Sequence, residues 1–448
     1  MTTQAPVAAI ATTLRPVSEQ QRLQNVDILR GIALLGILLM NIDVFAMPEY
    51  FSKPWRHDPS NINFWYRAVI TVLFEGKMRA LFSMLFGVGI LLFSTGKEKS
   101  GWPVTWLFYR RMWWLILFGI ADAHLLLWIG DILYLYGVCG LIAYLFRKMK
   151  PVYLAIGVPL VAIVSFVVEV QFYQDTRAKL LANNEAVQAQ QQHATLTEEQ
   201  KNAIDAWREY RSYFLPNMEE VAEHTAKMKS DYAGVAGYLR PLAFDWQTKF
   251  LQYMLGDAIA LMLLGMALYK WGFLSGKWTQ REYVITMIAG YGIGLPLVIW
   301  NYMYNYSFNK DVQTSLDHMA VTPIPWMGLI YPFQRMLLVM AHASLILILL
   351  QKGVLSGLMK RLGDVGRMAF TNYVMHTVIC TLVFFGYGLN QFDEWEYYQL
   401  YYLAAVIWVF QLWLSPLWLK YYLFGPLEWV WRSLTYWKLQ PFQRNAKA

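Results

Sequence analysis

The chain of 448 residues is 57% apolar and only 15% charged, and it contains 20 Trp, 29 Tyr and 25 Phe. A soluble domain has about 25% charged residues, so this composition predicts an integral membrane protein of the helical type. The net charge of +8 is typical of basic loops at the cytoplasmic face and does not indicate nucleic-acid binding. Cys139 and Cys380 both lie in apolar runs, which argues against a disulfide framework and against a metal site.

The apolar runs predict an all-α fold with ten membrane spans and no cleavable signal peptide, because residues up to Gln21 are polar. An amphipathic stretch, Phe64–Phe74, precedes the second span. The predicted spans are Asp27–Met47, Glu75–Thr95, two within Met112–Phe146, Pro151–Phe172, Phe250–Tyr269, Glu282–Met303, Trp326–Leu350, Met368–Gly388 and Tyr398–Leu419.

The stretch Met112–Phe146 is the one around which we expect the chain to be organised. As one helix it would be about 52 Å long at ~1.5 Å per residue, too long for a hydrocarbon core of ~30 Å. We therefore predict two short helices joined by a tight turn near Trp128–Gly130. That turn would bury His124 and Asp131 among apolar groups, and ionisable residues inside a membrane are usually functional.

Lys and Arg gather in alternate short connections, for example near Arg110, Arg147, Lys270 and Arg361. This asymmetry predicts that those connections and both termini are cytoplasmic. The predicted divisions are a cytoplasmic tail 1–24, spans one to five in 25–172, an extracytoplasmic helical insertion 173–246, spans six to ten in 247–424, and a cytoplasmic tail 425–448.

The insertion contains two helical patterns. LTEEQKNAIDAWREYRSYF predicts a helix with a capping box at Thr195–Glu198, and MEEVAEHTAKMK predicts another. The AVQAQQQ run, Ala186–Gln192, is polar and is expected to be mobile. We interpret the insertion as a helical cap over the outer face, and a solvated loop without a role is the alternative.

Ionisable groups of both signs fall at similar depth in the predicted spans, and they would line a polar cavity open to the outside. They are Asp43, Glu75, Lys77, Arg79, His124, Asp131, Asp257 and Arg335. Asp27 and Arg30 lie at the cytoplasmic mouth of the first span, three residues apart on one helix face, where they either meet a ligand or clamp the helix end. Lys77 and Arg79 have an alternative too, which is to extend toward the interface.

Among the histidines, His124 is the predicted general base, since Asp122 and Asp131 are close in sequence and a carboxylate orients an imidazole. For His342 and His376 the expected role is a hydrogen bond between helices. No phosphate-binding Gly-rich loop, His-Glu-x-x-His or Gly-x-Ser-x-Gly motif is present in the sequence.

Five blocks resemble the DUF418 / YeiB-like bacterial membrane proteins: Asn25–Ile42, Lys77–Ile90, His124–Ile142, Gly366–Ile379 and Gly425–Tyr436. That family is itself similar to the transmembrane acyltransferases, which include the acyltransferase-3 and heparan-glucosaminide acetyltransferase groups. Their shared D-x-x-R-G motif is matched by Asp27, Arg30 and Gly31. The resemblance implies a bundle of about ten helices, a cytoplasmic acyl donor such as acyl-CoA, and a buried histidine that assists transfer to an acceptor at the other face.

We assign the general base that the resemblance implies to His124. In the acyltransferase-3 group the histidine lies near the first helix, and in this chain the nearest candidate to that position is His57, in the WRHDPS loop. Our leading hypothesis is an acyltransferase of the bacterial inner membrane, with His124 oriented by Asp131 or Asp122. Acyl-CoA would be the co-substrate, and the acceptor would be a small molecule, a glycan or a lipid. We expect no permanently bound cofactor. We expect membrane lipids as partners and a homodimer as the assembly. The expected substrate-binding residues are Asp27, Arg30, Asn41, Glu75, Lys77, Arg79, Asp257, Arg335 and His376.

Two alternatives use the same residues differently. A transporter or lipid-handling protein would use the polar groups as a site reached from both sides, without covalent chemistry. A sensor would use the outer cap to bind a partner.

Overall fold

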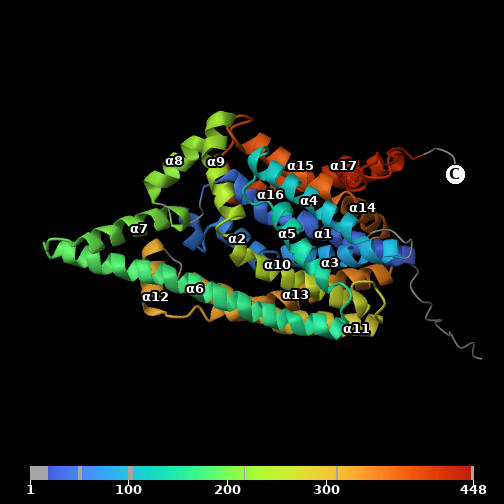
Figure 1. Cartoon of the computed structure of the whole chain (residues 1–448), viewed down its shortest axis with the longest axis horizontal. Coiled ribbons are helices and arrows are strands. Elements are labelled where there is room, and N and C mark those ends of the chain that lie inside the picture. The colour runs from blue at the N-terminus through green and yellow to red at the C-terminus, as the bar shows by residue number, and fades with distance from the viewer. Residues whose placement is uncertain (1–18, 49–52, 99–103, 216, 309–310, 445–448) are drawn as a thin grey trace, which may run out of the picture.

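The computed structural model describes residues 19–48, 53–98, 104–215, 217–308 and 311–444, and these residues form an all-helical bundle (Figure 1). Within them, seven helical segments are long and apolar enough to cross a membrane, and two shorter apolar helices, Leu133–Phe146 and Ala369–Phe384, accompany them. The predicted all-α membrane fold is therefore confirmed, while the count of ten crossings and the cytoplasmic location of the termini stay predictions.

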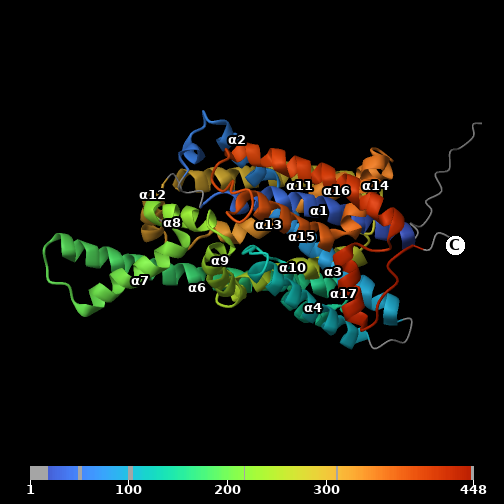
Figure 2. The ribbon, with the colours of Figure 1, turned by 90° about the horizontal axis from the view of Figure 1, so that it is seen from above.

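Each predicted span falls on a helix. They are α1 (Glu19–Ala46), α3 (Lys77–Glu98), α4 (Val104–His124), α5 (Leu133–Ala143), α6 (Pro151–Gln191), α10 (Leu251–Lys270), α11 (Gln280–Phe308), α13 (Met327–Gln351), α15 (Ala369–Phe384) and α16 (Tyr397–Tyr421). The amphipathic stretch before the second span is α2 (Ile62–Leu73). Seen from above, α16 and α14 (Ser356–Arg367) lie along one edge of the bundle, and α4 with α17 (Pro426–Tyr436) lies along the other (Figure 2).

Helix α1 lies at the centre and packs against α3, α14, α15 and α16. Its contact with α14 is close because both helices carry glycine there: a Cβ on Gly31 would lie 2.0 Å from the Leu362 carbonyl oxygen, and one on Gly366 would lie 1.8 Å from the Asp27 carbonyl oxygen. Small residues let membrane helices approach backbone to backbone. The glycine of the D-x-x-R-G motif therefore has a packing role.

The predicted hairpin is present, because α4 ends at His124 and α5 begins at Leu133. Two features fix the turn. Leu127 has a φ of 63°, a left-handed conformation that reverses the chain. The Asp131 carboxylate accepts hydrogen bonds from the backbone N–H groups of Leu133 at 3.0 Å and Tyr134 at 2.8 Å, so it caps the start of α5.

The insertion forms a cap at one end of the bundle. Helix α6 continues past the bundle, and α7 (Glu198–Phe214), α8 (Met218–Met228) and α9 (Tyr232–Gln247) return toward it, with α12 (Val312–Val321) beside α6 (Figures 1 and 2). We name this the cap end, and the opposite end, where α14 and α17 lie, the tail end. The capping box lies at Thr197 and Gln200, two residues later than predicted. The polar run that is expected to be mobile is helical in the structure as far as Gln191, where α6 ends.

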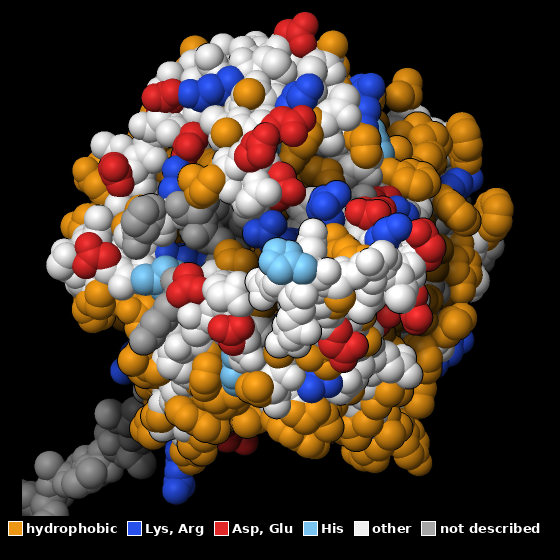
Figure 3. All heavy atoms as spheres, turned by 90° about the vertical axis from the view of Figure 1, so that its left-hand side faces the viewer, with side chains coloured by type: hydrophobic (Ala, Val, Ile, Leu, Met, Phe, Trp, Pro, Cys, Tyr) orange, Lys and Arg blue, Asp and Glu red, His pale blue; other side chains and the backbone are white. Residues whose placement is uncertain are grey.

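The surface agrees with a membrane environment. Charged side chains of both signs cover the cap end, and hydrophobic side chains gather at its edges (Figure 3). Only 11% of the apolar 18-residue segment of α6 is buried, and Leu160 and Val164 are 61% and 62% exposed. Apolar side chains on a flank are stable against lipid tails and unfavourable in water.

Candidate functional site

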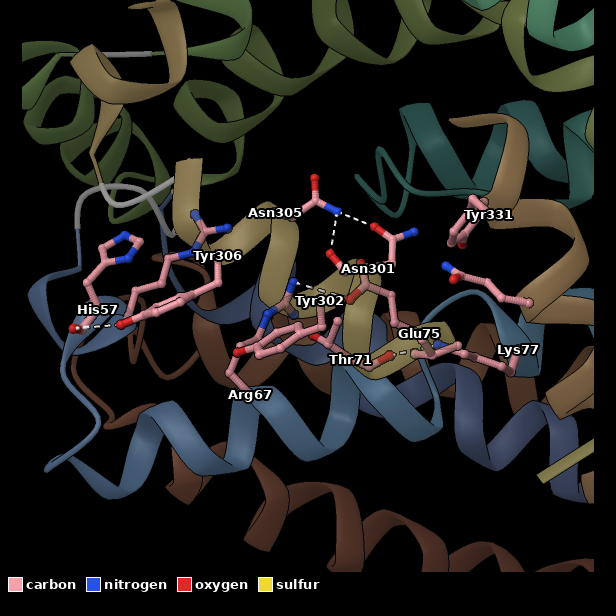
Figure 4. Close-up of a pocket in the computed structure, with 13 residues that line it drawn as sticks. His57, Arg67, Thr71, Glu75, Lys77, Asn301, Tyr302, Asn305, Tyr306 and Tyr331 are labelled. Carbon is pink, nitrogen blue, oxygen red and sulfur yellow. Dashed lines mark hydrogen bonds and ion pairs between the residues drawn. The ribbon is translucent and has the colours of Figure 1, made fainter. Parts of the chain in front are cut away.

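A polar cavity of about 280 Å³ lies at the cap end, where α2, the α2–α3 junction and α11 meet η2 (Pro54–His57) (Figure 4). We name it the cap-end cavity. Its polar side chains come from segments that are far apart in sequence. They are Arg56, His57, Arg67, Thr71, Glu75, Lys77, Asn301, Tyr302, Asn305, Tyr306, Tyr331 and Gln334.

The interruption of the helix between α2 and α3 places Lys77 in this cavity. Gly76 has a φ of +72°, which favours glycine, and it allows α3 to begin directly at Lys77. The Lys77 side chain is 3% exposed, and its ammonium donates to the Thr71 carbonyl oxygen at 2.8 Å. Satisfying one donor leaves two of its N–H groups for a ligand in the cavity.

Arg67 and Glu75 form the charged wall beside Lys77. Their guanidinium and carboxylate groups are 3.6 Å apart, and Arg67 also pairs with Asp43 of α1 at 3.3 Å. Figure 4 shows Arg67, Glu75 and Lys77 along the α2–α3 side of the cavity, facing Asn301 and Asn305 of α11. The cavity thus offers cationic groups on one side and hydrogen-bonding amides on the other to a bound ligand.

His57 lies at the same cavity, next to Tyr306, whose hydroxyl donates to the His57 carbonyl oxygen at 3.3 Å. Neither ring nitrogen of His57 has a hydrogen-bond partner among the described residues. Burial lowers the pKa of His57, and the neighbouring Arg56 acts in the same direction. A neutral imidazole with a free nitrogen can accept a proton, as a general base must.

A second cavity, of about 460 Å³, lies between α6, α10 and α13, and we name it the flank cavity. Its polar end is an ion cluster: the Arg335 guanidinium donates to both carboxylate oxygens of Asp257, and Arg79 lies 3.6 Å from the same carboxylate. Arg335 is 2% exposed, and its Nε has no hydrogen-bond partner among the described residues. The rest of the wall is mostly apolar, with Phe166 and Phe333 among its members.

A third cavity, of about 540 Å³, opens at the tail end, and we name it the tail-end cavity. Asp27 and Arg30 pair within it at 2.9 Å, as the sequence predicted. The Arg111 guanidinium lies 3.5 Å from the centre of the Trp431 ring. Its charged lining residues are Asp27, Arg30, Arg111, Arg367, Glu428 and Arg432, and apolar side chains of α3, α4, α5 and α15 line its interior.

Tyr136 of α5 lies between the tail-end cavity and the flank cavity and lines both. Its hydroxyl and that of Ser83 are 2.6 Å apart, and it donates to the Arg79 carbonyl oxygen at 3.4 Å. Tyr331 in turn lines both the flank cavity and the cap-end cavity. The three cavities therefore form a series, with one tyrosine at each junction.

The structure distributes the predicted site residues instead of gathering them in one pocket. Glu75 and Lys77 line the cap-end cavity, Arg79, Asp257 and Arg335 the flank cavity, and Asp27 and Arg30 the tail-end cavity. Asn41 is partly buried on α1 and lies outside all three.

The predicted pairing of His124 with a carboxylate is not formed. The His124 ring is bonded to the Gln247 side chain of α9 at 3.0 Å, and its carbonyl oxygen accepts from Arg240. The carboxyl groups of Asp122 and Asp131 are neighbours, and Thr377 donates to Asp122 at 3.4 Å. The reason is rotation: α4 ends at His124, so its ring turns out toward the cap while Asp122 faces the interior.

His376 and His342 have the role expected of membrane histidines. His376 bonds Gln411 of α16 at 3.0 Å and does not line the three cavities. His342 bonds the Tyr291 hydroxyl at 2.8 Å and the Leu73 carbonyl oxygen at 2.9 Å, so it links α13 with α11 and α2.

Asp131→Ala is expected to destabilise the hairpin by about 1–2 kcal/mol, because it removes the cap of α5. Asp131→Asn retains an acceptor oxygen and should lose less. Thermal unfolding of the detergent-solubilised protein measures both. Equal losses in the two variants would mean that the carboxyl pair with Asp122, and not the cap, provides the stabilisation.

Sequence reasoning missed Arg67, Arg111, Arg432 and Tyr136. Arg67 lies in the predicted amphipathic stretch Phe64–Phe74, and Arg111 adjoins Arg110 in a connection that was used only to predict orientation. A signal for Arg111 was present, since it directly precedes MWWLILF and therefore enters the membrane with the helix. Tyr136 carries no such signal, because many tyrosines of this chain lie in apolar runs.

Comparison with known proteins gives a family but no activity. The family described as "Protein of unknown function (DUF418)" matches residues 268–438. Relatives include "Uncharacterized protein YxaH" of Bacillus subtilis (strain 168), 27% identical and covering 97% of this chain and 100% of the relative, and "Uncharacterized protein YeiB" of Escherichia coli (strain K12), 28% identical and covering 93% and 96%. No solved structure matches the chain.

Proposed function

Since this chain belongs to the DUF418 family and is a multi-pass membrane protein, we propose that it is an acyltransferase of the bacterial inner membrane. It would move an acyl group from a cytoplasmic donor at the tail end to an acceptor at the cap end. The observation that carries the proposal is the series of three cavities, in which each neighbouring pair shares one tyrosine in its lining.

The tail-end cavity suits an acyl-CoA donor. Four arginines and two acids surround its mouth, which gives it an excess of positive charge for phosphate groups. Its interior is apolar, as an acyl chain or a pantetheine arm requires. Asp27 holds Arg30 at 2.9 Å and so fixes the direction in which this guanidinium points.

The cap-end cavity suits the acceptor. His57 would remove the acceptor proton, and Lys77, which lies at the other end of the cavity (Figure 4), would bind an anionic group of the acceptor. In this step the carbon–sulfur bond of the thioester breaks and a carbon–oxygen or carbon–nitrogen bond to the acceptor forms. The acceptor proton goes to His57, and the leaving thiolate takes up a proton from water.

His57→Gln is expected to slow acyl transfer roughly 100- to 10,000-fold, the usual contribution of a general base. Thiol release from acetyl-CoA and from palmitoyl-CoA by the purified protein measures it. Because burial lowers the pKa of His57, the imidazole stays neutral below the ordinary histidine value of 6.5. The acid limb of the pH profile should therefore have its midpoint below pH 6.5, and should disappear in His57→Gln.

His124→Ala is the matched control, since the His124 ring bonds Gln247 of α9 and His124 is not among the described residues that line the three cavities. The proposal expects turnover close to that of the unmodified protein. If His124→Ala lost thiol release and His57→Gln kept it, the general base would be His124, and the cap-end cavity would not take part in acyl transfer.

A proton-coupled transporter is the second candidate, and the Asp122–Asp131 pair favours it. Asp122 is 1% exposed inside the bundle and its carboxyl group is a neighbour of that of Asp131, and two adjacent buried carboxyl groups disfavour a second negative charge. Such groups are common in proton relays of transporters. No thiol release with either thioester, together with a proton flux in liposomes that Asp122→Asn abolishes, would favour transport over transfer.

A further inference from the structure

The flank cavity differs from the other two because it reaches the lipid-facing side of the molecule. Ile163 of α6 and Phe333 of α13 both line it, and they are 54% and 50% exposed. Helix α6 packs on α10, while its other face is open. A hydrocarbon chain can therefore enter from the bilayer between α6 and α13 without crossing water.

The polar end of this cavity has unused hydrogen-bonding capacity. Arg335 is neutralised by Asp257, yet its buried Nε has no partner among the described residues. The Arg79 side chain is 42% exposed, and within the described residues its ion pair is the 3.6 Å contact with Asp257. A guanidinium has five N–H donors, so Arg79 can bind phosphate oxygens while it remains near Asp257.

An acid lies at the same cavity. Glu169 of α6 lines it and is exposed, and no ion pair to Glu169 is present in the described part of the chain. The carboxylate lies against the backbone of Gly328, where a Cβ would be 2.8 Å from Oε1. Glu169 is eighteen residues after Pro151, the start of α6. At ~1.5 Å per residue this is about 27 Å, close to the thickness of the hydrocarbon core, so the carboxylate lies at headgroup depth.

We infer that the flank cavity binds a zwitterionic aminophospholipid. Its phosphate contacts Arg79 and the Nε side of Arg335, its ammonium pairs with Glu169, and one acyl chain lies along the apolar wall that includes Phe166 and Phe333. The two arginines and two acids of the cavity balance, which suits a headgroup with one charge of each sign better than an anionic headgroup. This site does not depend on the proposed acyl transfer.

The experiment is a titration of the delipidated full-length protein with dioctanoyl phosphatidylethanolamine, phosphatidylcholine and phosphatidylglycerol, followed by native mass spectrometry. The expected order of affinity is phosphatidylethanolamine first, because a primary ammonium donates to Glu169 and a quaternary one does not. Arg79→Gln should weaken all three lipids roughly tenfold, since it removes one charge-assisted contact. Arg335 is left intact, because its removal would destabilise the protein and so obscure a change in lipid binding.

Glu169→Gln provides the sharper test. It should remove the preference for phosphatidylethanolamine over phosphatidylglycerol and leave binding of phosphatidylglycerol unchanged or stronger. Arg208→Gln on the exposed face of α7 is the control and should change nothing. Equal affinities for the three lipids, or a preference that survives Glu169→Gln, would overturn the assignment. Since the readout is binding, it is independent of thiol release.

Discussion

Replacing Arg335 with methionine should lower the free energy of unfolding by about 3–5 kcal/mol, which is the usual effect of breaking one half of a buried ion pair. Arg335 is 2% exposed, and its guanidinium bonds both oxygens of Asp257. Methionine fills most of the volume but leaves Asp257 with only the longer contact to Arg79 at 3.6 Å. The loss therefore comes from an uncompensated carboxylate in the bundle more than from a cavity.

A double variant separates these causes. Arg335→Met with Asp257→Leu removes both charges, and buried ion pairs replaced by apolar residues often lose little stability. We expect the double variant to be more stable than Arg335→Met alone, as measured by thermal unfolding in detergent. The control is Arg208→Met, whose pair with Asp205 is exposed on both sides. A double variant no better than the single one would mean that shape, and not charge, makes Arg335 necessary.

The helices of this protein could be predicted from sequence because their signal is local. Long apolar runs that alternate with basic connections determine where α1, α10 or α13 begins and ends, and the short α4–α5 hairpin followed from the length of one run. The same local reasoning found the Asp27–Arg30 pair, whose members are three residues apart on one helix.

The division into three cavities could not be predicted, since it depends on how each helix is rotated. Lys77 and Arg79 are two positions apart, and a helix turns by about 200° over that distance at 3.6 residues per turn. They consequently line different cavities, the cap-end cavity and the flank cavity. Arg335 and Asp257 are predicted at equal depth but become partners only because α13 and α10 face each other across the flank cavity.

The expectation for His124 failed for the same reason. Its nearness in sequence to Asp122 and Asp131 says nothing about direction at a helix end, and its ring leaves α4 toward Gln247 of the cap. His57 has no carboxylate close to it in sequence except Asp58, yet tertiary structure places it with Glu75 and Lys77. Site residues on different helices converge through packing that periodicity does not encode.

That packing is most demanding where α1 meets α14, and Gly366→Ala should test it. The new Cβ would lie 1.8 Å from the Asp27 carbonyl oxygen and 2.8 Å from the Gly31 nitrogen. Both atoms are backbone, so they cannot turn aside as a side chain would. Overpacking usually destabilises by about 1–3 kcal/mol, and we expect the upper part of that range or more, measured by thermal unfolding.

Gly357→Ala is the matched control, since it lies on the same helix and a Cβ there has nothing within 4 Å. It should leave unfolding unchanged or raise stability slightly, because alanine restricts the unfolded chain.

The two variants should also differ in donor binding. Separating α14 from α1 moves Arg367 away from Asp27 and Arg30, which line the same tail-end cavity. Gly366→Ala is therefore expected to weaken acyl-CoA binding while Gly357→Ala does not; equal binding by both would mean that this helix contact supports the fold without shaping the cavity.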